Sequence, residues 1–239
     1  MLRINTFGGL SLRQGDAPLT GAPSQRRRLA LLAVLAVAGE QGISRDKLLA
    51  MLWPESDEEK SRHALNQILY AQRRDFGEQQ LFNGQKTVRL NPSLITSDVA
   101  LFERALTDGD LEAAVGLYAG PFLDGFFLSG SSEFEIWVGD QRARFANRLA
   151  ESLDAAARSA AQSNDHETEI KWRRHAVQLD RTDAARVLRL CESLVLAGNR
   201  AGALRALNDC QNRIKQELGV PGDPSIARRI SELTLELGG

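Results

Sequence analysis

A segment rich in side chains that can read nucleic acid lies between Ser56 and Gly77. At about 100° per residue, the apolar residues Leu65, Ile68 and Leu69 form one face of a helix. The opposite face and its flank carry Lys60, His63, Asn66, Gln67, Tyr70 and Arg74. Gln and Asn amides can form two hydrogen bonds with an adenine edge, and Arg can do the same with guanine. The pattern therefore predicts a base-reading helix, and the alternative is an ordinary solvated helix face.

Basic side chains in and around this helix suit the phosphate backbone, which positions a protein without specifying sequence. They are Arg27, Arg28, Arg45, Lys60, Arg62, Arg73, Arg74, Lys86 and Arg89. In the arginine triplet, residues 26–28, the dipole at a helix start would add to the guanidinium charge. Three acids, Asp57, Glu58 and Glu59, oppose phosphates, so we expect them to cap the helix, to face away or, for Glu59, to accept from cytosine.

The elements around this helix follow the order of a winged helix. Residues 2–19 alternate apolar and polar residues, which predicts a short hairpin or small sheet. Pro23-Ser24 opens a helix to about Ala38, and Ser44 is the expected N-cap of a second helix, Arg45–Leu52. Ser56 and Glu59 form a capping box for the third helix, which continues to about Phe76.

A hairpin is expected next, over residues 80–90. Asn83-Gly84 lies between strand-like flanks, and both residues tolerate the positive φ of a type I′ turn. In a winged helix the second helix of the helix-turn-helix pair enters the major groove, and the hairpin becomes the wing. Residues 91–93 are predicted to connect this hairpin to the rest of the chain.

The remainder of the chain is predicted to be helical. The expected helices are 98–106, 111–118, 132–163, 164–179, 183–196 and 200–218, with a last one from Asp223-Pro224. Ser132 with Glu135 and Asn164 with Glu167 form two further capping boxes.

A repeat of 34 residues runs through this part. The matched pairs are Asn164-Asp165 with Gly198-Asn199, Ala157 with Cys191, Ala161 with Val195, Ile170 with Leu204 and Ala176 with Cys210. Paired helices at this period are typical of tetratricopeptide repeats, with generic helical hairpins as the alternative. The fold class expected is thus an α+β N-terminal winged helix-turn-helix, residues 1–95, followed by an all-α tetratricopeptide-like helical-repeat domain, residues 96–239, mainly α overall.

Composition narrows the function further. The 239 residues are 43% hydrophobic and carry a net charge of −1, which excludes a disordered chain or a uniformly basic one. Residues 1–95 nevertheless hold 13 Lys and Arg against 9 Asp and Glu, as expected of a DNA reader joined to another module. No phosphate loop, nucleophile elbow or zinc motif is present, so neither an enzyme nor a cofactor or metal site is expected. The longest apolar run, Leu29–Ala38, is too short to span a bilayer, so we expect a cytoplasmic protein without membrane contact. Cys191 and Cys210 are expected to be reduced core residues.

Several segments resemble those of one bacterial family. RRRLALLAVLAVAGEQGISRDKLLAMLWPE and SRHALNQILYAQRRDFG resemble the winged helix of the SARP (Streptomyces antibiotic regulatory protein) family, a relative of the OmpR/PhoB type. DVALFERAL, FEIWVGDQRARF and the 34-residue repeat resemble the bacterial transcriptional activator domain (BTAD) that follows it. The resemblance covers nearly the whole chain, which is expected to be either a compact member or a fragment of a longer one.

The resemblance implies a transcriptional activator that binds promoter direct repeats. Double-stranded DNA and the RNA polymerase holoenzyme would be its partners, and a homodimer on DNA is allowed. The polymerase would be contacted by the loop before the reading helix, through Trp53, Glu55, Ser56 and Asp57. The alternative function is a helical-repeat scaffold whose winged helix binds a protein rather than DNA.

Overall fold

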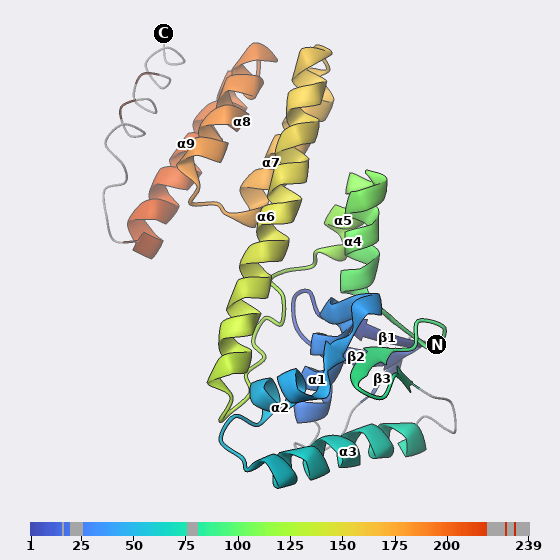
Figure 1. Ribbon diagram of the computed structural model, residues 1–239. Coiled ribbons are helices and arrows are strands. Elements are labelled where there is room, and N and C mark those ends of the chain that lie inside the picture. Colours follow the sequence, from blue (N-terminus) through green and yellow to red (C-terminus); the bar gives the residue numbers. More distant parts are fainter. Residues whose placement is uncertain (16, 20–25, 76–80, 219–227, 229–231, 233–239) are drawn as a thin grey trace. The chain divides into compact units, whose positions relative to one another are not determined.

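The computed structural model of the chain describes residues 1–15, 17–19, 26–75, 81–218, 228 and 232 (Figure 1). The side chains of residues 72–75 and 218 are outside this description. The chain divides into two compact units, residues 1–145 and 146–239. Helix α6 (Ser132–Gln162) passes from the first unit into the second. None of the helices in the described ranges is long and apolar enough to cross a bilayer.

The N-terminus of the first unit forms a small sheet. Its strands are β1 (Leu2–Asn5), β2 (Ser11–Gln14), β3 (Ala17–Pro18) and β7 (Ile95–Ser97), in the order β3-β2-β1-β7. β1 pairs antiparallel with β2, which confirms the small sheet predicted for residues 2–19. β1 also pairs parallel with β7, where the sequence predicts no strand. The segment after the connector thus completes the N-terminal sheet.

The helices of the winged helix follow the predicted order. They are α1 (Arg26–Ala38), α2 (Arg45–Leu52) and α3 (Glu58–Asp75). Residues 30–36 of α1 are all buried, so the long apolar run is a core helix. Ser44 caps α2 by accepting from the Lys47 amide at 3.3 Å, as predicted. The predicted start of the first helix at Pro23-Ser24 and the end of the third beyond Asp75 lie outside the described residues.

A second sheet forms the wing. It consists of β4 (Ile43–Ser44), β6 (Thr87–Leu90) and β5 (Phe82–Asn83), in the order β4-β6-β5. The predicted type I′ turn is wrong, because Asn83 pairs with Arg89 as part of the strand. Gly84 starts the loop instead, with φ +91°, a conformation that suits glycine. The hairpin is therefore present with a longer turn than the sequence indicates.

The predicted capping boxes are wrong. α3 is capped by Asp57, whose Oδ1 accepts from the Lys60 amide at 2.8 Å, and not by Ser56. Likewise Asp165 caps helix α7 (His166–Leu179) by accepting from the Thr168 amide at 3.1 Å. At the third box Ser132 is already helical, and Glu135 accepts from the Leu128 amide at 2.7 Å. In the first two cases a neighbouring Asp one residue later takes the cap.

A helical hairpin and an aromatic cluster complete the first unit. Helices α4 (Asp98–Asp108) and α5 (Leu111–Leu117) turn at Gly109, as predicted. The Phe7 ring lies 5.0 Å from those of Phe102 and Tyr118 and 5.4 Å from that of Phe145, centroid to centroid. These contacts join the β1–β2 turn to α4 and α6, which is why this unit extends to residue 145. The functional division at residue 95 stays a prediction.

In the second unit, the residues up to 218 form two helical hairpins with the same turn. They are the second half of α6 with α7, and α8 (Ala184–Leu196) with α9 (Arg200–Arg213), which a π-helical turn, Ile214–Leu218, extends. The Asp165 amide donates to Ala160 at 2.9 Å, and 34 residues later the Asn199 amide donates to Leu194 at 2.7 Å. This equivalence confirms the tetratricopeptide-like repeat. The last predicted helix, from Asp223-Pro224, lies outside the described residues.

The cysteines belong to the core of this unit. Cys191 and Cys210 are free and buried, as predicted. Burial raises the pKa of the Cys191 thiol to about 12, so it stays protonated at neutral pH. A protonated, buried thiol is unreactive.

Candidate nucleic-acid interface

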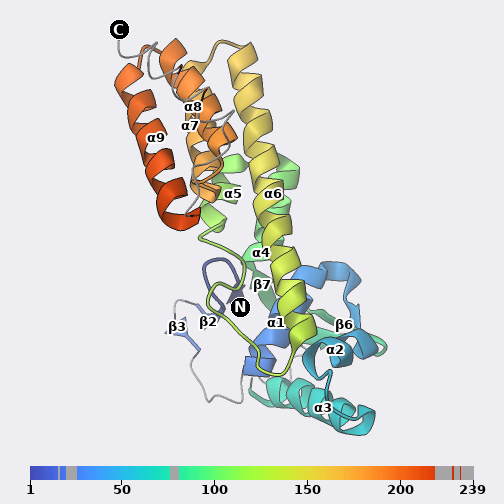
Figure 2. The ribbon, with the colours of Figure 1, turned by 90° about the vertical axis from the view of Figure 1, so that its left-hand side faces the viewer.

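Helix α3 has one buried face and one open face. Leu65 and Leu69 are 1% and 7% exposed and pack inward, which confirms the predicted apolar stripe. The predicted base-reading side chains on the other face are exposed. They are His63, Asn66, Gln67 and Tyr70. Figures 1 and 2 show α3 crossing the end of the winged helix, with α1 and α2 on one side of it. Among the described residues, these polar side chains are therefore accessible to solvent.

Acids at the start of α3 neutralise the nearest basic side chains. The Lys60 ammonium lies 2.7 Å from Asp57 Oδ2, and the Arg62 guanidinium lies 2.5 Å from Glu58 Oε1. Hydrogen bonds from the Lys60 side chain and amide lower the pKa of Asp57. Both pairs are exposed, and such pairs contribute little to stability. The acids hold Lys60 and Arg62 only weakly, and phosphate binding by these two residues stays a prediction.

Amides in the middle of α3 are held by neighbouring side chains. The Arg45 Nη1 donates to Asn66 Oδ1 at 2.9 Å. The Gln67 Nε2 lies 2.8 Å from the His63 Nε2, one turn earlier on the helix. Which of the two nitrogens donates depends on the tautomer of the His63 ring. Two of the predicted base-reading side chains, Asn66 and Gln67, are thus in contact with neighbouring side chains.

The wing and the C-terminal end of α3 supply further basic residues. Lys86 and Arg89 are exposed on the β5–β6 hairpin. The carbonyl oxygen of Lys86 accepts from the Arg45 amide at 3.2 Å, which fastens the hairpin to α2. The side chains of Arg73 and Arg74 lie outside the described residues.

Arg27 of α1 makes its contacts within the protein. The Arg27 Nε donates to the Leu52 carbonyl at 3.3 Å, and its guanidinium lies 5.8 Å from the centroid of the Trp53 ring. Arg27 thus satisfies a carbonyl at the end of α2, where helices leave such groups without a backbone partner. Arg28 is half-buried. The sequence does not indicate these internal contacts, and phosphate binding by both residues stays a prediction.

The loop between α2 and α3 combines a buried anchor with an exposed rim. Trp53 is only 7% exposed. Glu55, Ser56 and Asp57 are exposed. Three of the four predicted polymerase-contact residues are therefore accessible, whereas Trp53 is buried and anchors the loop. The hydroxyl of Ser131 also donates to the Met51 carbonyl at 2.8 Å, a link that the sequence does not indicate.

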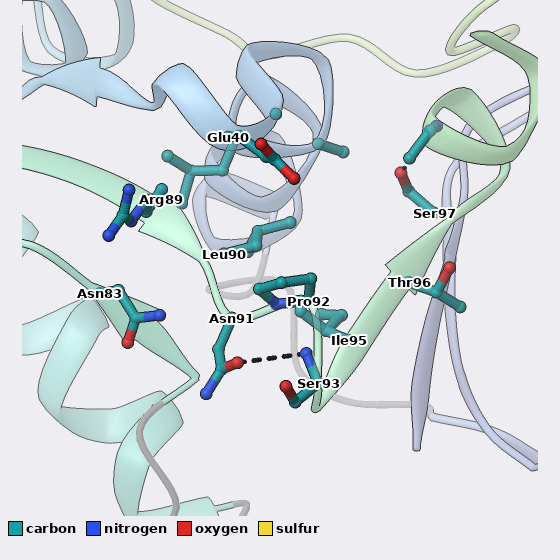
Figure 3. Close-up of a pocket in the computed structure, with 14 residues that line it drawn as sticks. Glu40, Asn83, Arg89, Leu90, Asn91, Pro92, Ser93, Ile95, Thr96 and Ser97 are labelled. Carbon is teal, nitrogen blue, oxygen red and sulfur yellow. Dashed lines mark hydrogen bonds between the residues drawn. The ribbon is translucent and has the colours of Figure 1, made fainter. Parts of the chain in front are cut away.

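A cavity of about 520 Å³ adjoins the wing (Figure 3). Leu90, Pro92 and Ile95 line it together with Glu40 and Arg89. Arg89 therefore lies on the part of the hairpin next to α1 and β7. No sequence signal indicates this cavity, because its walls come from separate elements. In the described part of the chain, no three His, Cys, Asp or Glu residues are grouped as a metal site.

Residues 99–234, more than half of the chain, match the family model of the bacterial transcriptional activator domain. The structure is similar to that of Mycobacterium tuberculosis EmbR, which was solved in complex with a low-affinity phosphopeptide. The TM-score is 0.58 at 16% sequence identity, and the likeness covers 98% of this chain and 65% of the EmbR chain. This chain therefore spans less than two thirds of the length of that relative.

A weaker likeness links the chain to the TPR2B domain of yeast Sti1, solved in complex with pHsp70. The TM-score is 0.30 at 16% identity, over 59% of this chain and 93% of that one. No curated protein matches the chain.

Proposed function

This chain belongs to the family of SARP-type transcriptional regulators, which join a winged helix to a bacterial transcriptional activator domain, and on that basis we propose a function in two parts. It is an activator that binds promoter direct repeats through α3 and the wing. It then recruits the RNA polymerase holoenzyme through the loop Trp53–Asp57. Both partners place its action in the cytoplasm.

The open polar face of α3 is the observation that supports DNA reading most directly. Exposed side chains able to bond base edges follow one another along that face, whereas Leu65 and Leu69 anchor the helix on the other. The helix comes second in a helix-turn-helix pair, and it is the second helix that enters the major groove in such folds. Lys86 is exposed on the wing, where its positive charge would meet the phosphate backbone of the DNA.

Selection from random duplexes tests the first part. We expect enrichment of a motif repeated at a spacing of about one helical turn, or 10–10.5 base pairs, as two copies side by side would require. Affinity should fall steeply with salt, because each neutralised phosphate releases counterions. A protein that retains no duplex even in dilute buffer would contradict DNA reading and would favour the scaffold function.

The second part depends on the exposed rim of the loop. Glu55→Ala removes an exposed carboxylate there. We expect lower transcript yield from a target promoter in vitro and unchanged promoter affinity. Glu151→Ala, an exposed position on α6, is the control and should change neither. Equal yields from the two variants would count against a polymerase contact at Glu55.

A further inference from the structure

Arg45 joins three elements of the winged helix. It is the first residue of α2, and its Nη1 donates to Asn66 Oδ1 on α3 at 2.9 Å. Its Nε donates to the Gln85 carbonyl in the wing hairpin at 2.8 Å. Its own amide donates to the Lys86 carbonyl at 3.2 Å. The guanidinium is therefore held by the wing while it contacts the reading helix.

This contact determines which way the Asn66 amide points. The oxygen and nitrogen of an amide occupy nearly the same shape, so the group can turn over unless a partner distinguishes them. A guanidinium has only donors. If Asn66 turned over, its NH₂ group would face the N–H groups of Arg45. Asn66 must therefore keep Oδ1 toward Arg45, and among the described residues no contact is shown for its N–H groups.

Gln67 provides a contrast on the same face. Its amide contacts the His63 ring, whose nitrogen can accept or donate depending on the tautomer. The polarity of the Gln67 amide is therefore not determined by its partner in the way that of Asn66 is.

We propose that Arg45 is a positioning residue for base reading, which sets the polarity of the Asn66 amide and so the base pair preferred at one position. The inference rests on the proposed DNA reading by α3. An amide of set polarity matches one order of acceptor and donor along a base edge, as adenine presents them. An amide free to turn over matches either order. Arg45 thus acts through Asn66 and does not itself have to touch a base.

Arg45→Lys separates this role from that of charge. Lys keeps the positive charge but lacks the planar fork that serves Asn66 and the Gln85 carbonyl together. In selection from random duplexes, we expect the preference at one base pair to fall about tenfold, within the range of one bidentate contact. Affinity for random duplex, measured at several salt concentrations, reports any change in phosphate contacts separately. Lys47→Arg, at an exposed position of the same helix, is the matched control and should keep every preference.

Asn66→Ala should remove the same preference. The double variant of Arg45→Lys and Asn66→Ala should be no worse than Asn66→Ala, because the two side chains act as one unit. Arg45→Gln is a second variant in case Arg45→Lys does not fold. Its amide both donates and accepts, so it releases Asn66 and should blur the same base pair. Far-UV circular dichroism and urea unfolding establish that each variant is folded.

The possible outcomes distinguish failure of this inference from failure of the proposed DNA reading. Loss of preference at one position, shared with Asn66→Ala, supports the inference. If Arg45→Lys and Arg45→Gln keep every preference of the wild type, the inference is overturned and the proposed function stands. Loss spread evenly over all positions also overturns it, since Arg45 would then support docking of the whole wing. A wild-type protein without any sequence preference would overturn both.

Discussion

Asp98 fastens the first turn of α4 to Thr6, at the end of β1. Its Oδ2 accepts from the Thr6 amide at 2.6 Å, and its Oδ1 accepts from the Thr6 hydroxyl at 2.7 Å. The Phe7 amide also donates to Oδ2, at 2.8 Å. Asp98 and Thr6 are both buried, at 4% and 0% exposure. The carboxylate is therefore the point at which the N-terminal sheet and the first activator-domain helix are held together.

Asp98→Ala should destabilise the first unit strongly. It leaves the Thr6 and Phe7 donors buried without their acceptor, which costs about 2–4 kcal/mol. Urea unfolding followed by circular dichroism measures the loss. Asp108→Ala at the other end of α4 is the control, since its pair with Arg104 is exposed and should be worth less than about 0.5 kcal/mol. Similar unfolding midpoints for the two variants would contradict the role of Asp98.

Glu169→Gln should remove one source of acid sensitivity from the second unit. Burial raises the pKa of Glu169, but hydrogen bonds from Ser193 and Arg173 lower it more, so the net pKa is below its ordinary 4.5. A lowered folded-state pKa stabilises the fold above the unfolded-state value, and this stabilisation is lost as pH falls through the folded-state value. The stability advantage of the wild type over Glu169→Gln should therefore be constant near neutrality and shrink below about pH 4.5.

Unfolding midpoints measured as a function of pH check this dependence. Asp165 and Asp180, whose pKa values hydrogen bonds also lower, are present in both proteins and cancel in the difference. Glu167→Gln, at an exposed position of α7, should track the wild type throughout. An advantage that stayed constant as pH fell through 4.5 and below would contradict a lowered folded-state pKa for Glu169.

Gln67→Ala and Lys86→Ala should weaken DNA binding in different ways. Gln67 would bond a base edge, so its loss should cost about 1–3 kcal/mol of discrimination at one position. Lys86 would meet a phosphate, so its loss should weaken all sequences alike and lower the salt slope by about 1. Affinities for matched and mismatched duplexes at several salt concentrations distinguish the two. Parallel losses in both variants would argue against the assignment of α3 as the reading helix.

Gly84→Ala and Gly139→Ala should change stability in opposite directions. Gly84 has φ +91°, and an added Cβ would lie 2.0 Å from the Thr87 carbonyl oxygen, so the wing turn should lose more than about 1 kcal/mol. Gly139 lies within α6, with nothing within 4 Å of an added Cβ. Ala there should stabilise the helix by about 0.5–1 kcal/mol. Thermal unfolding gives both signs, and a stabilised Gly84→Ala would contradict the turn described for the wing.

Elements determined by local sequence were predictable. α2 begins after Ser44 and ends at Leu52 as expected, because a capping residue precedes its apolar spacing and Trp53-Pro54 stops it. The turns at Asn164 and Gly198 were found from spacing alone. The caps of α3 and α7 were misplaced by one residue. Ser56 and Asp57 can both cap, and the choice depends on where the helix starts, which the local pattern does not decide.

Contacts between distant segments were not predictable. β7 pairs with β1 although more than 90 residues separate them, and Asp98 reaches Thr6 over a similar distance. Arg27 was predicted to meet phosphate by its type, yet it binds the Leu52 carbonyl, because the fold brings an unpaired helix end within its reach. Arg45 was expected at the interface, but its contact with Asn66 depends on how α2 and α3 cross.

The parallel pairing of β1 with β7 has a consequence for anyone who would dissect the chain. A fragment that ended at residue 95 would lose most of strand β7 and Asp98, which accepts from Thr6. Phe7 would also lose its ring contacts with Phe102 on α4 and Phe145 on α6. The winged helix and the first helices of the activator domain thus share one compact unit, so a cut between them removes contacts from both sides.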